Sequence, residues 1–209
     1  TIHADVLIAT GQWPEAEHAL ESALTTHATY VPQMSAPTVA TLAELRIRQG
    51  RLRDAEDLLA GRDQEPTSLR VLALLRLAEG RPTDAVTLLR RGLVGCADSE
   101  VQAAQLLAPL VDALLDTGDA EGAAEAADQV SFVAERTGIR LVAALAELAQ
   151  ARVALAAGRT DAAADSAGRS LASFDGLAMP YGAAQARLEL ARALAGTAPE
   201  LAGDEVRTA

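Results

Sequence analysis

Apolar residues recur along this chain at the three- and four-residue spacing that places side chains on one face of an α-helix. Residues 73–89 show how the pattern is interrupted, because an apolar helical stretch ends at Gly80 and Pro82 opens a second one. Proline is favoured in the first turn of a helix, where its missing N–H costs no hydrogen bond. The segment therefore predicts a helix, a tight turn and a second helix packed against the first.

The same turn recurs five times with the pattern Gly-x-x-x-x-Ala, always between apolar stretches. The copies begin at Gly11, Gly50, Gly80, Gly118 and Gly158. Their spacings are 39, 30, 38 and 40 residues, which indicates repeating helical hairpins. A single hairpin buries too little apolar surface to be stable, so such units stack on their neighbours. We therefore expect an all-α solenoid of about five to six antiparallel hairpins, forming a right-handed superhelix.

We expect this array to form one helical-repeat domain over residues 1–209. The predicted hairpins cover residues 1–30, 36–62, 66–95, 100–137, 139–175 and 181–209. Pro109 lies inside the helix expected at 100–117, and its missing N–H predicts a kink or a new helix start there. The chain opens without Met inside one helical pattern and stops inside another. We therefore expect it to be a fragment of a larger protein.

Composition narrows the functions that such an array can serve. Half of the residues are hydrophobic, but there are only one Trp, two Tyr and two Phe, so Ala, Leu and Val must form the core. A formal net charge of −11 repels phosphate and argues against nucleic-acid or anionic-membrane binding by this chain. No apolar run reaches the roughly 18 residues of a membrane span. Cys96 is the single cysteine, which fits a reducing, cytoplasmic location.

The repeats resemble the tetratricopeptide repeat (TPR) family. Small residues stand seven before the turn glycine in most units, with Val111 as a departure: Ala4, Ala43, Ala73 and Ala151. Alanine stands five after each turn glycine, at the family's small position in the second helix: Ala16, Ala55, Ala85, Ala123 and Ala163. The usual first-helix Trp and Tyr are missing, and Gly196 is followed five residues on by Leu201. The likeness is therefore to a divergent, longer-period branch.

Two longer segments resemble the repeat region of large actinobacterial LuxR-type (MalT-like) transcriptional regulators. They are residues 41–61, TLAELRIRQGRLRDAEDLLAG, and residues 179–194, MPYGAAQARLELARAL. In such regulators a TPR-like array precedes a C-terminal helix-turn-helix. The resemblance implies that DNA is met only by a separate helix-turn-helix domain, which would follow Ala209 and is not in this chain.

The sequence holds no motif typical of an enzyme, so we expect a non-catalytic protein without cofactor or metal. The chain has no lysine and thus no Gly-x-x-x-x-Gly-Lys phosphate loop. Its histidines, His3, His18 and His27, lie in the first hairpin without metal-ligand spacing and are expected to face solvent. Asp112 and Asp116 share one helix face and could hold a cation or act as an acid. A solvated helix surface is the simpler interpretation of that pair.

Shape and surface charge remain as the carriers of function. In a TPR superhelix the first helix of each hairpin lines the concave groove. Aligning the units on their turn glycines places six charged residues towards that groove: Glu44, Arg48, Arg70, Asp112, Asp116 and Arg152. These charges could clamp a peptide terminus or another domain through charge-assisted hydrogen bonds. The alternative is ordinary solvated helix surface.

We therefore expect a protein-interaction or signal-sensing region of a LuxR-type regulator. Its partner would be a protein, a peptide or a small effector, and a homodimer through an end of the array is a further possibility. Two alternatives stay open. One is a generic TPR docking module of an unrelated assembly or enzyme, and the other is a small-molecule-binding helical domain.

Overall fold

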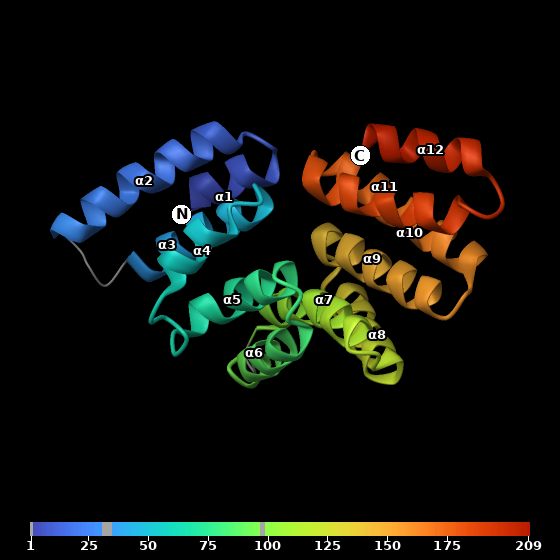
Figure 1. The fold of residues 1–209 in the computed structure, drawn as a ribbon, viewed down its shortest axis with the longest axis horizontal. Coiled ribbons are helices and arrows are strands. Elements are labelled where there is room, and N and C mark those ends of the chain that lie inside the picture. The colour runs from blue at the N-terminus through green and yellow to red at the C-terminus, as the bar shows by residue number, and fades with distance from the viewer. Residues whose placement is uncertain (1, 31–34, 97–98) are drawn as a thin grey trace. The chain divides into compact units, whose positions relative to one another are not determined.

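The computed structural model describes residues 2–30, 35–96 and 99–209, and within these ranges every regular element is an α-helix (Figure 1). The helices are α1 (Ile2–Ala9), α2 (Trp13–Tyr30), α3 (Ser35–Arg48), α4 (Leu52–Leu59), α5 (Pro66–Ala78), α6 (Pro82–Val94), α7 (Glu100–Asp116), α8 (Ala120–Thr137), α9 (Arg140–Ala156), α10 (Thr160–Gly176), α11 (Pro180–Leu194) and α12 (Pro199–Thr208). Consecutive helices pair into hairpins, as predicted. Within the same ranges, no helix combines the length and apolar character needed to cross a membrane.

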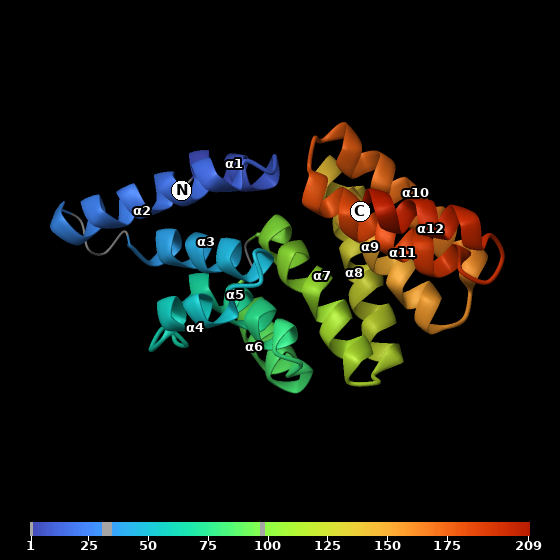
Figure 2. The same ribbon diagram turned by 45° about the horizontal axis from the view of Figure 1, so that its top comes forward.

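The chain divides into two compact units, an N-terminal unit (Thr1–Gly95) and a C-terminal unit (Cys96–Ala209). In the N-terminal unit α3 packs against α1, α2, α4 and α5. In the C-terminal unit α9 packs in the same way against α7, α8, α10 and α11 (Figure 2). The first helices of successive hairpins therefore touch one another directly and form a layer in each unit. Within each unit, a second helix packs against the first helix of its own hairpin and that of the following hairpin.

All five turn glycines adopt a left-handed backbone, with φ between 70° and 82°. At Gly50, the glycine N–H donates to Ile47 O at 2.9 Å and the Arg51 N–H donates to Arg46 O at 2.8 Å. This is the Schellman motif, which satisfies the last carbonyls of a helix. A Cβ at Gly50, Gly80, Gly118 or Gly158 would meet nothing within 4 Å. Glycine is therefore required by the backbone conformation and not by crowding.

Among the residues that the structure describes, the same turn geometry occurs at one that is not glycine. After α10, Ala178 has φ 54°. Its N–H donates to Asp175 O at 3.0 Å, and the Met179 N–H donates to Phe174 O at 3.0 Å. Ala178 is exposed, so its methyl group strains the backbone and gains little from packing.

The small positions of the repeat are the points of closest helix contact. Ala16, Ala55, Ala85, Ala123 and Ala163 are all fully buried. Their first-helix counterparts are buried too: Ala4, Ala43, Ala73, Val111 and Ala151. At the first turn, the Trp13 indole Nε1–H donates to Ile8 O at 3.3 Å and the ring packs on the neighbouring core. Trp13 thus fastens its hairpin.

Three local expectations differ from the structure. Helix α7 runs unbroken through the buried Pro109, so this proline does not mark a new helix start. His27 is half-buried, and its Nδ1 lies 3.3 Å from Thr38 Oγ1, whereas His3 and His18 are exposed. The interval left between the first two predicted hairpins, residues 31–35, is one residue shorter, because α3 begins at Ser35; residues 31–34 lie outside the described ranges.

Candidate functional site

The charged residues predicted for the N-terminal unit come together around a single carboxylate. Glu44 on α3 accepts a hydrogen bond from Arg48 Nη2 at 2.6 Å, one helical turn away. Arg70, on the neighbouring first helix α5, pairs with the same carboxylate through its Nη2 group. Asp5 on α1 lies on the same side, where it accepts a hydrogen bond from Thr41 Oγ1 at 3.3 Å. We call Asp5, Glu44, Arg48 and Arg70 the N-terminal charge cluster.

Electrostatics within this cluster favour an ionised Glu44. Burial, which leaves the Glu44 side chain 12% exposed, acts to raise its pKa. The positive charges of Arg70 and Arg48, together with their hydrogen bonds, outweigh burial and lower the pKa of Glu44 to about 2. The pKa of Asp5 shifts the other way, because burial raises it and Glu44 adds a like charge. The negative charge of Glu44 is thus balanced by arginines within the protein, whereas Asp5 forms no ion pair with a described residue.

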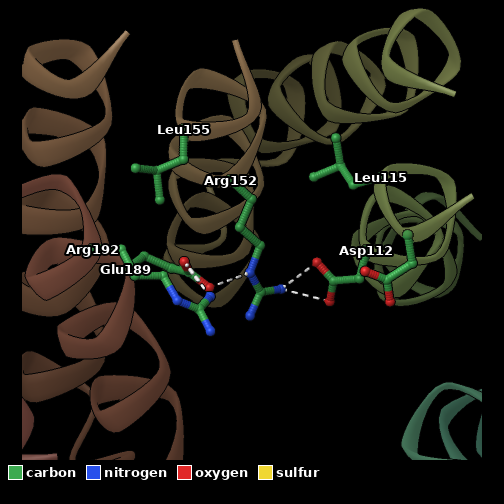
Figure 3. Close-up of a pocket in the computed structure, with 7 residues that line it drawn as sticks. Asp112, Leu115, Arg152, Leu155, Glu189 and Arg192 are labelled. Carbon is green, nitrogen blue, oxygen red and sulfur yellow. Dashed lines mark hydrogen bonds and ion pairs between the residues drawn. The ribbon is translucent and has the colours of Figure 1, made fainter. Parts of the chain in front are cut away.

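A second group forms in the C-terminal unit around Arg152 on α9. Its Nη1 donates to both oxygens of Asp112 on α7, at 2.7 and 2.6 Å. Its Nε donates to Glu189 Oε1 on α11 at 3.0 Å. Figure 3 shows Arg152 lying between these two carboxylates, with Arg192 beside Glu189. The Arg192 Nη1–H donates to Glu189 Oε2 at 2.8 Å. We call Asp112, Asp116, Arg152, Glu189 and Arg192 the C-terminal charge cluster.

The carboxylates of this cluster outnumber its cations. Burial raises the pKa of Asp112, and the negative charges of Glu189 and Asp116 act in the same direction against Arg152. The pKa of Arg152 is also raised, because its two carboxylate partners outweigh the burial that would lower it. Asp116 is exposed and forms no ion pair with any residue that the structure describes. One negative charge is therefore left over at this place.

An open pocket of about 320 Å³ lies over the C-terminal charge cluster. Its walls come from α7, α9 and α11, the three first helices of this unit. The lining consists of Asp112, Leu115, Asp116, Arg152, Leu155, Glu189 and Arg192. Leu115 and Leu155 are the two apolar side chains among them, and both are labelled in Figure 3. The pocket therefore combines charged groups with apolar walls.

The repeat register explains why these charges meet. Four of them stand six residues before a turn glycine: Asp5, Glu44, Asp112 and Arg152. Because first helices touch their neighbours directly, one position repeated along the chain becomes a row of adjacent side chains. All six residues singled out in the sequence lie on first helices: Glu44, Arg48, Arg70, Asp112, Asp116 and Arg152. The first three share the N-terminal charge cluster, and the last three share the C-terminal one.

The sequence pattern missed three members of these clusters, namely Asp5, Glu189 and Arg192. Asp5 stands at the same register position as Glu44, so a strict alignment on Gly11 would have found it. Glu189 is a glutamate only 6% exposed in the side chain, in a helix whose turn departs from the motif. Asp112 and Asp116 differ in their surroundings: Asp112 is bound to Arg152, whereas Asp116 is exposed.

Another buried arginine has a purely structural position. Arg46 on α3 is 5% exposed and pairs with Glu17 at 2.5 Å and Glu21 at 3.0 Å, both on α2. These contacts join the second helix of one hairpin to the first helix of the next. They involve neither Glu44 nor Arg48, so we assign Arg46 to packing.

Comparison with known proteins bears on the repeat itself. A family model described as tetratricopeptide repeat matches residues 41–101. This range contains most of the α3–α4 hairpin and all of the α5–α6 hairpin. A search of curated proteins found no match. The chain is thus similar to TPR proteins in its repeat, and TPR arrays generally act as non-catalytic scaffolds for protein–protein interaction.

Proposed function

We propose that this chain is the protein-interaction region of a LuxR-type transcriptional regulator, and that its first-helix layers bind a segment of a partner protein. The supporting observation is that each unit gathers charges from successive first helices onto one face. Asp112, Arg152 and Glu189 come from three consecutive hairpins. A peptide lying along such a layer would meet all three hairpins at once.

The two charge clusters suit recognition because their groups are held but not fully buried. Arg152 and Asp112 are 17% and 31% exposed in their side chains. Their mutual ion pair fixes the rotamers before a partner arrives, which lowers the entropy cost of binding. Charge-assisted hydrogen bonds to such groups are about twice as strong as neutral ones. Electrostatic complementarity of this kind favours specificity for a charged partner segment.

The link to transcription is supported by the resemblance of residues 41–61 and 179–194 to LuxR-type regulators. In our proposal a partner or effector bound to the array changes its curvature or its self-association. Either change alters how an attached helix-turn-helix meets DNA. The test is the parent open reading frame: a helix-turn-helix coding segment downstream of Ala209 is expected, and a frame without one would refute the regulator assignment.

Interaction itself is tested by selection from a random peptide library displayed on phage, with the 209-residue chain as bait. We expect enriched peptide families whose binding falls in a double variant, Glu44→Gln with Arg152→Leu. Selection of no peptide family from several independent libraries would contradict a peptide-binding role. Enrichment that the double variant retains in full would place the binding surface outside the charge clusters.

A small-molecule effector is the second candidate, favoured by the open pocket on the C-terminal unit. Its volume lies at the lower end of the range typical of ligand sites. Thermal-shift screening of the chain against a metabolite library tests this alternative. A reproducible rise in the unfolding temperature that Arg152→Leu abolishes would support a small-molecule effector. No change with any compound would leave protein partners as the remaining candidates.

Self-association is a further proposal, since apolar side chains are exposed near both ends. Ile2 and Val6 on α1 are 81% and 54% exposed, and Leu201 and Val206 on α12 are 58% and 55% exposed. Exposed apolar patches commonly mark interaction sites. Light scattering after size exclusion would show a dimer that Ile2→Ser with Val6→Ser dissociates. A concentration-independent monomer would refute this proposal.

A further inference from the structure

The negative charge of the chain is concentrated in one of its units. Residues 96–209 carry 17 Asp and Glu against 8 Arg, a formal charge of −9, whereas residues 1–95 carry 12 against 10, a formal charge of −2. An acidic surface attracts cationic partners and raises their association rate. The C-terminal unit therefore favours a basic partner segment, and the N-terminal unit has little such preference.

The C-terminal charge cluster repeats this imbalance on a smaller scale. It holds three carboxylates, Asp112, Asp116 and Glu189, and two guanidinium groups. Both guanidinium groups are occupied, because Arg152 bridges two carboxylates and Arg192 holds the far oxygen of Glu189. The carboxylate of Asp116 lines the pocket and is exposed. An incoming cation would find its counter-charge there without breaking an existing ion pair.

The apolar walls of the pocket define what kind of cation fits. Leu115 follows Asp112 by three residues on α7, and Leu155 follows Arg152 by three residues on α9. Each leucine thus stands one helical turn from a charged group of the cluster. Lysine and arginine side chains pack their methylene stems on apolar surface while the charged head contacts carboxylates. A small hydrated metal ion would gain nothing from these walls.

We propose that the pocket formed by α7, α9 and α11 binds an arginine or lysine side chain of a partner protein, with Asp116 as the principal counter-charge. The charged head lies between Asp116 and Asp112, and the stem lies between Leu115 and Leu155. Arg152 keeps Asp112 and Glu189 in position and does not itself contact the partner cation. This proposal rests on the peptide-binding function proposed above and names the chemical class that one site recognises.

An anionic partner group is disfavoured at the same place. Arg192 is 67% exposed in its side chain and is the one cation of the cluster that a carboxylate could approach. Such a group would draw Arg192 away from Glu189, which is 6% exposed and accepts hydrogen bonds from Arg152 and Arg192, and it would add a negative charge where carboxylates already outnumber cations. Leaving a buried carboxylate with a weakened ion pair is unfavourable. A cation that binds at Asp116 leaves the ion pairs of Glu189 intact.

The test uses peptides selected by the 209-residue chain from the phage library. We expect the enriched families to share arginine or lysine at one fixed position. One selected peptide is then synthesised with a fluorophore, and its Kd is measured by fluorescence anisotropy. Replacing the fixed cation by citrulline or norleucine should weaken binding about tenfold, the effect of one charge-assisted hydrogen bond.

The protein variants separate the pocket from general electrostatics. Asp116→Asn should weaken binding of the cationic peptide about tenfold, whereas Glu125→Gln should leave its Kd nearly unchanged. Glu125 is an exposed residue of α8, on a second helix of the same unit, so the two variants remove the same charge. Equal weakening by both would reduce the effect to net charge and overturn the proposal.

The remaining outcomes are also distinct. Peptides that bind at the charge clusters but share no cationic position would overturn this inference and leave the peptide-binding function standing. A selection that yields no binding peptide would refute the peptide-binding function itself. A cationic peptide whose Kd is unaffected by Asp116→Asn would place the cation elsewhere and refute the assignment of the pocket.

Discussion

Ala178 offers a clean measure of how strongly backbone conformation governs these turns. It occupies the left-handed position that glycine holds in the five repeated turns, with φ 54°. Its methyl group is exposed and contributes little packing. Ala178→Gly therefore removes a steric conflict in the folded state while changing almost nothing else there.

The magnitude follows from two opposing terms. A left-handed conformation costs a non-glycine residue about 1–2 kcal/mol. Glycine gains conformational entropy in the unfolded chain, which offsets about 0.4–1 kcal/mol of the benefit. We expect Ala178→Gly to raise the free energy of unfolding by about 0.5–1 kcal/mol. The reverse change at a matched turn, Gly158→Ala, should lower it by a similar amount, because φ is 70° and no atom lies near the added methyl.

Urea unfolding followed by far-UV circular dichroism measures both effects. Ala162→Gly is the matched control, because Ala162 is an exposed residue inside α10. There the same chemical change should destabilise the protein by about 0.5–1 kcal/mol. The reasoning predicts opposite signs for one substitution at two exposed sites. Destabilisation by Ala178→Gly equal to that by Ala162→Gly would refute it.

Three further predictions concern side chains. The pKa of Glu44 is depressed from 4.5 to about 2, so its ionised form contributes about 3 kcal/mol to the free energy of unfolding. This contribution is present above pH 4.5 and is lost as the pH falls towards 2. Urea unfolding across this range should therefore show a steeper loss of stability for the wild type than for Glu44→Gln. Arg152→Leu leaves Asp112 without its cation and should cost about 2 kcal/mol at pH 7. Because the pKa of Asp112 is raised by burial, this cost should fall as the pH is lowered and the carboxyl group takes up a proton. A cost that does not change with pH would contradict the electrostatic explanation. Gly182→Ala places a Cβ 2.5 Å from the Phe174 ring and should destabilise the protein by more than about 1 kcal/mol. Gly168→Ala, inside α10 with nothing within 4 Å of the added Cβ, should stabilise it by up to about 1 kcal/mol. Both effects are measured as midpoints of thermal unfolding, and equal shifts in the two variants would refute the packing argument.

The hairpins were predictable because their signals are local. A turn glycine and the alanine five residues after it report geometry within one short stretch of chain. Gly50 and Ala55 show this, since φ at Gly50 is 75° and Ala55 is fully buried. Proline was less informative, because α7 continues through the buried Pro109.

The charge clusters were only partly predictable, because a side chain's role depends on what the neighbouring hairpin places opposite it. Arg46 and Arg48 are two residues apart on α3, yet Arg46 joins α2 and Arg48 joins Glu44. The alignment on turn glycines did not identify Glu189, because the last turn has a different hydrogen-bonding pattern. There both the Thr197 and the Ala198 N–H donate to Leu194 O, and Ala202 takes the buried place while Leu201 is exposed. The residue six before Gly196 is Leu190, so counting from this glycine selects an apolar residue and passes over Glu189.

The bridging position of Arg152 also bears on how the C-terminal unit comes apart. In a near-neighbour array the last hairpin can fray by itself when its interface is weak. Here the departure of α11 would separate Glu189 from Arg152, while Glu189 would keep Arg192 on its own helix and Arg152 would keep Asp112. Separating α11 from α9 thus breaks the ion pair between Arg152 and Glu189 in addition to exposing apolar surface. We therefore expect the three hairpins to unfold cooperatively. A ligand bound to the face that they share would stabilise all three together.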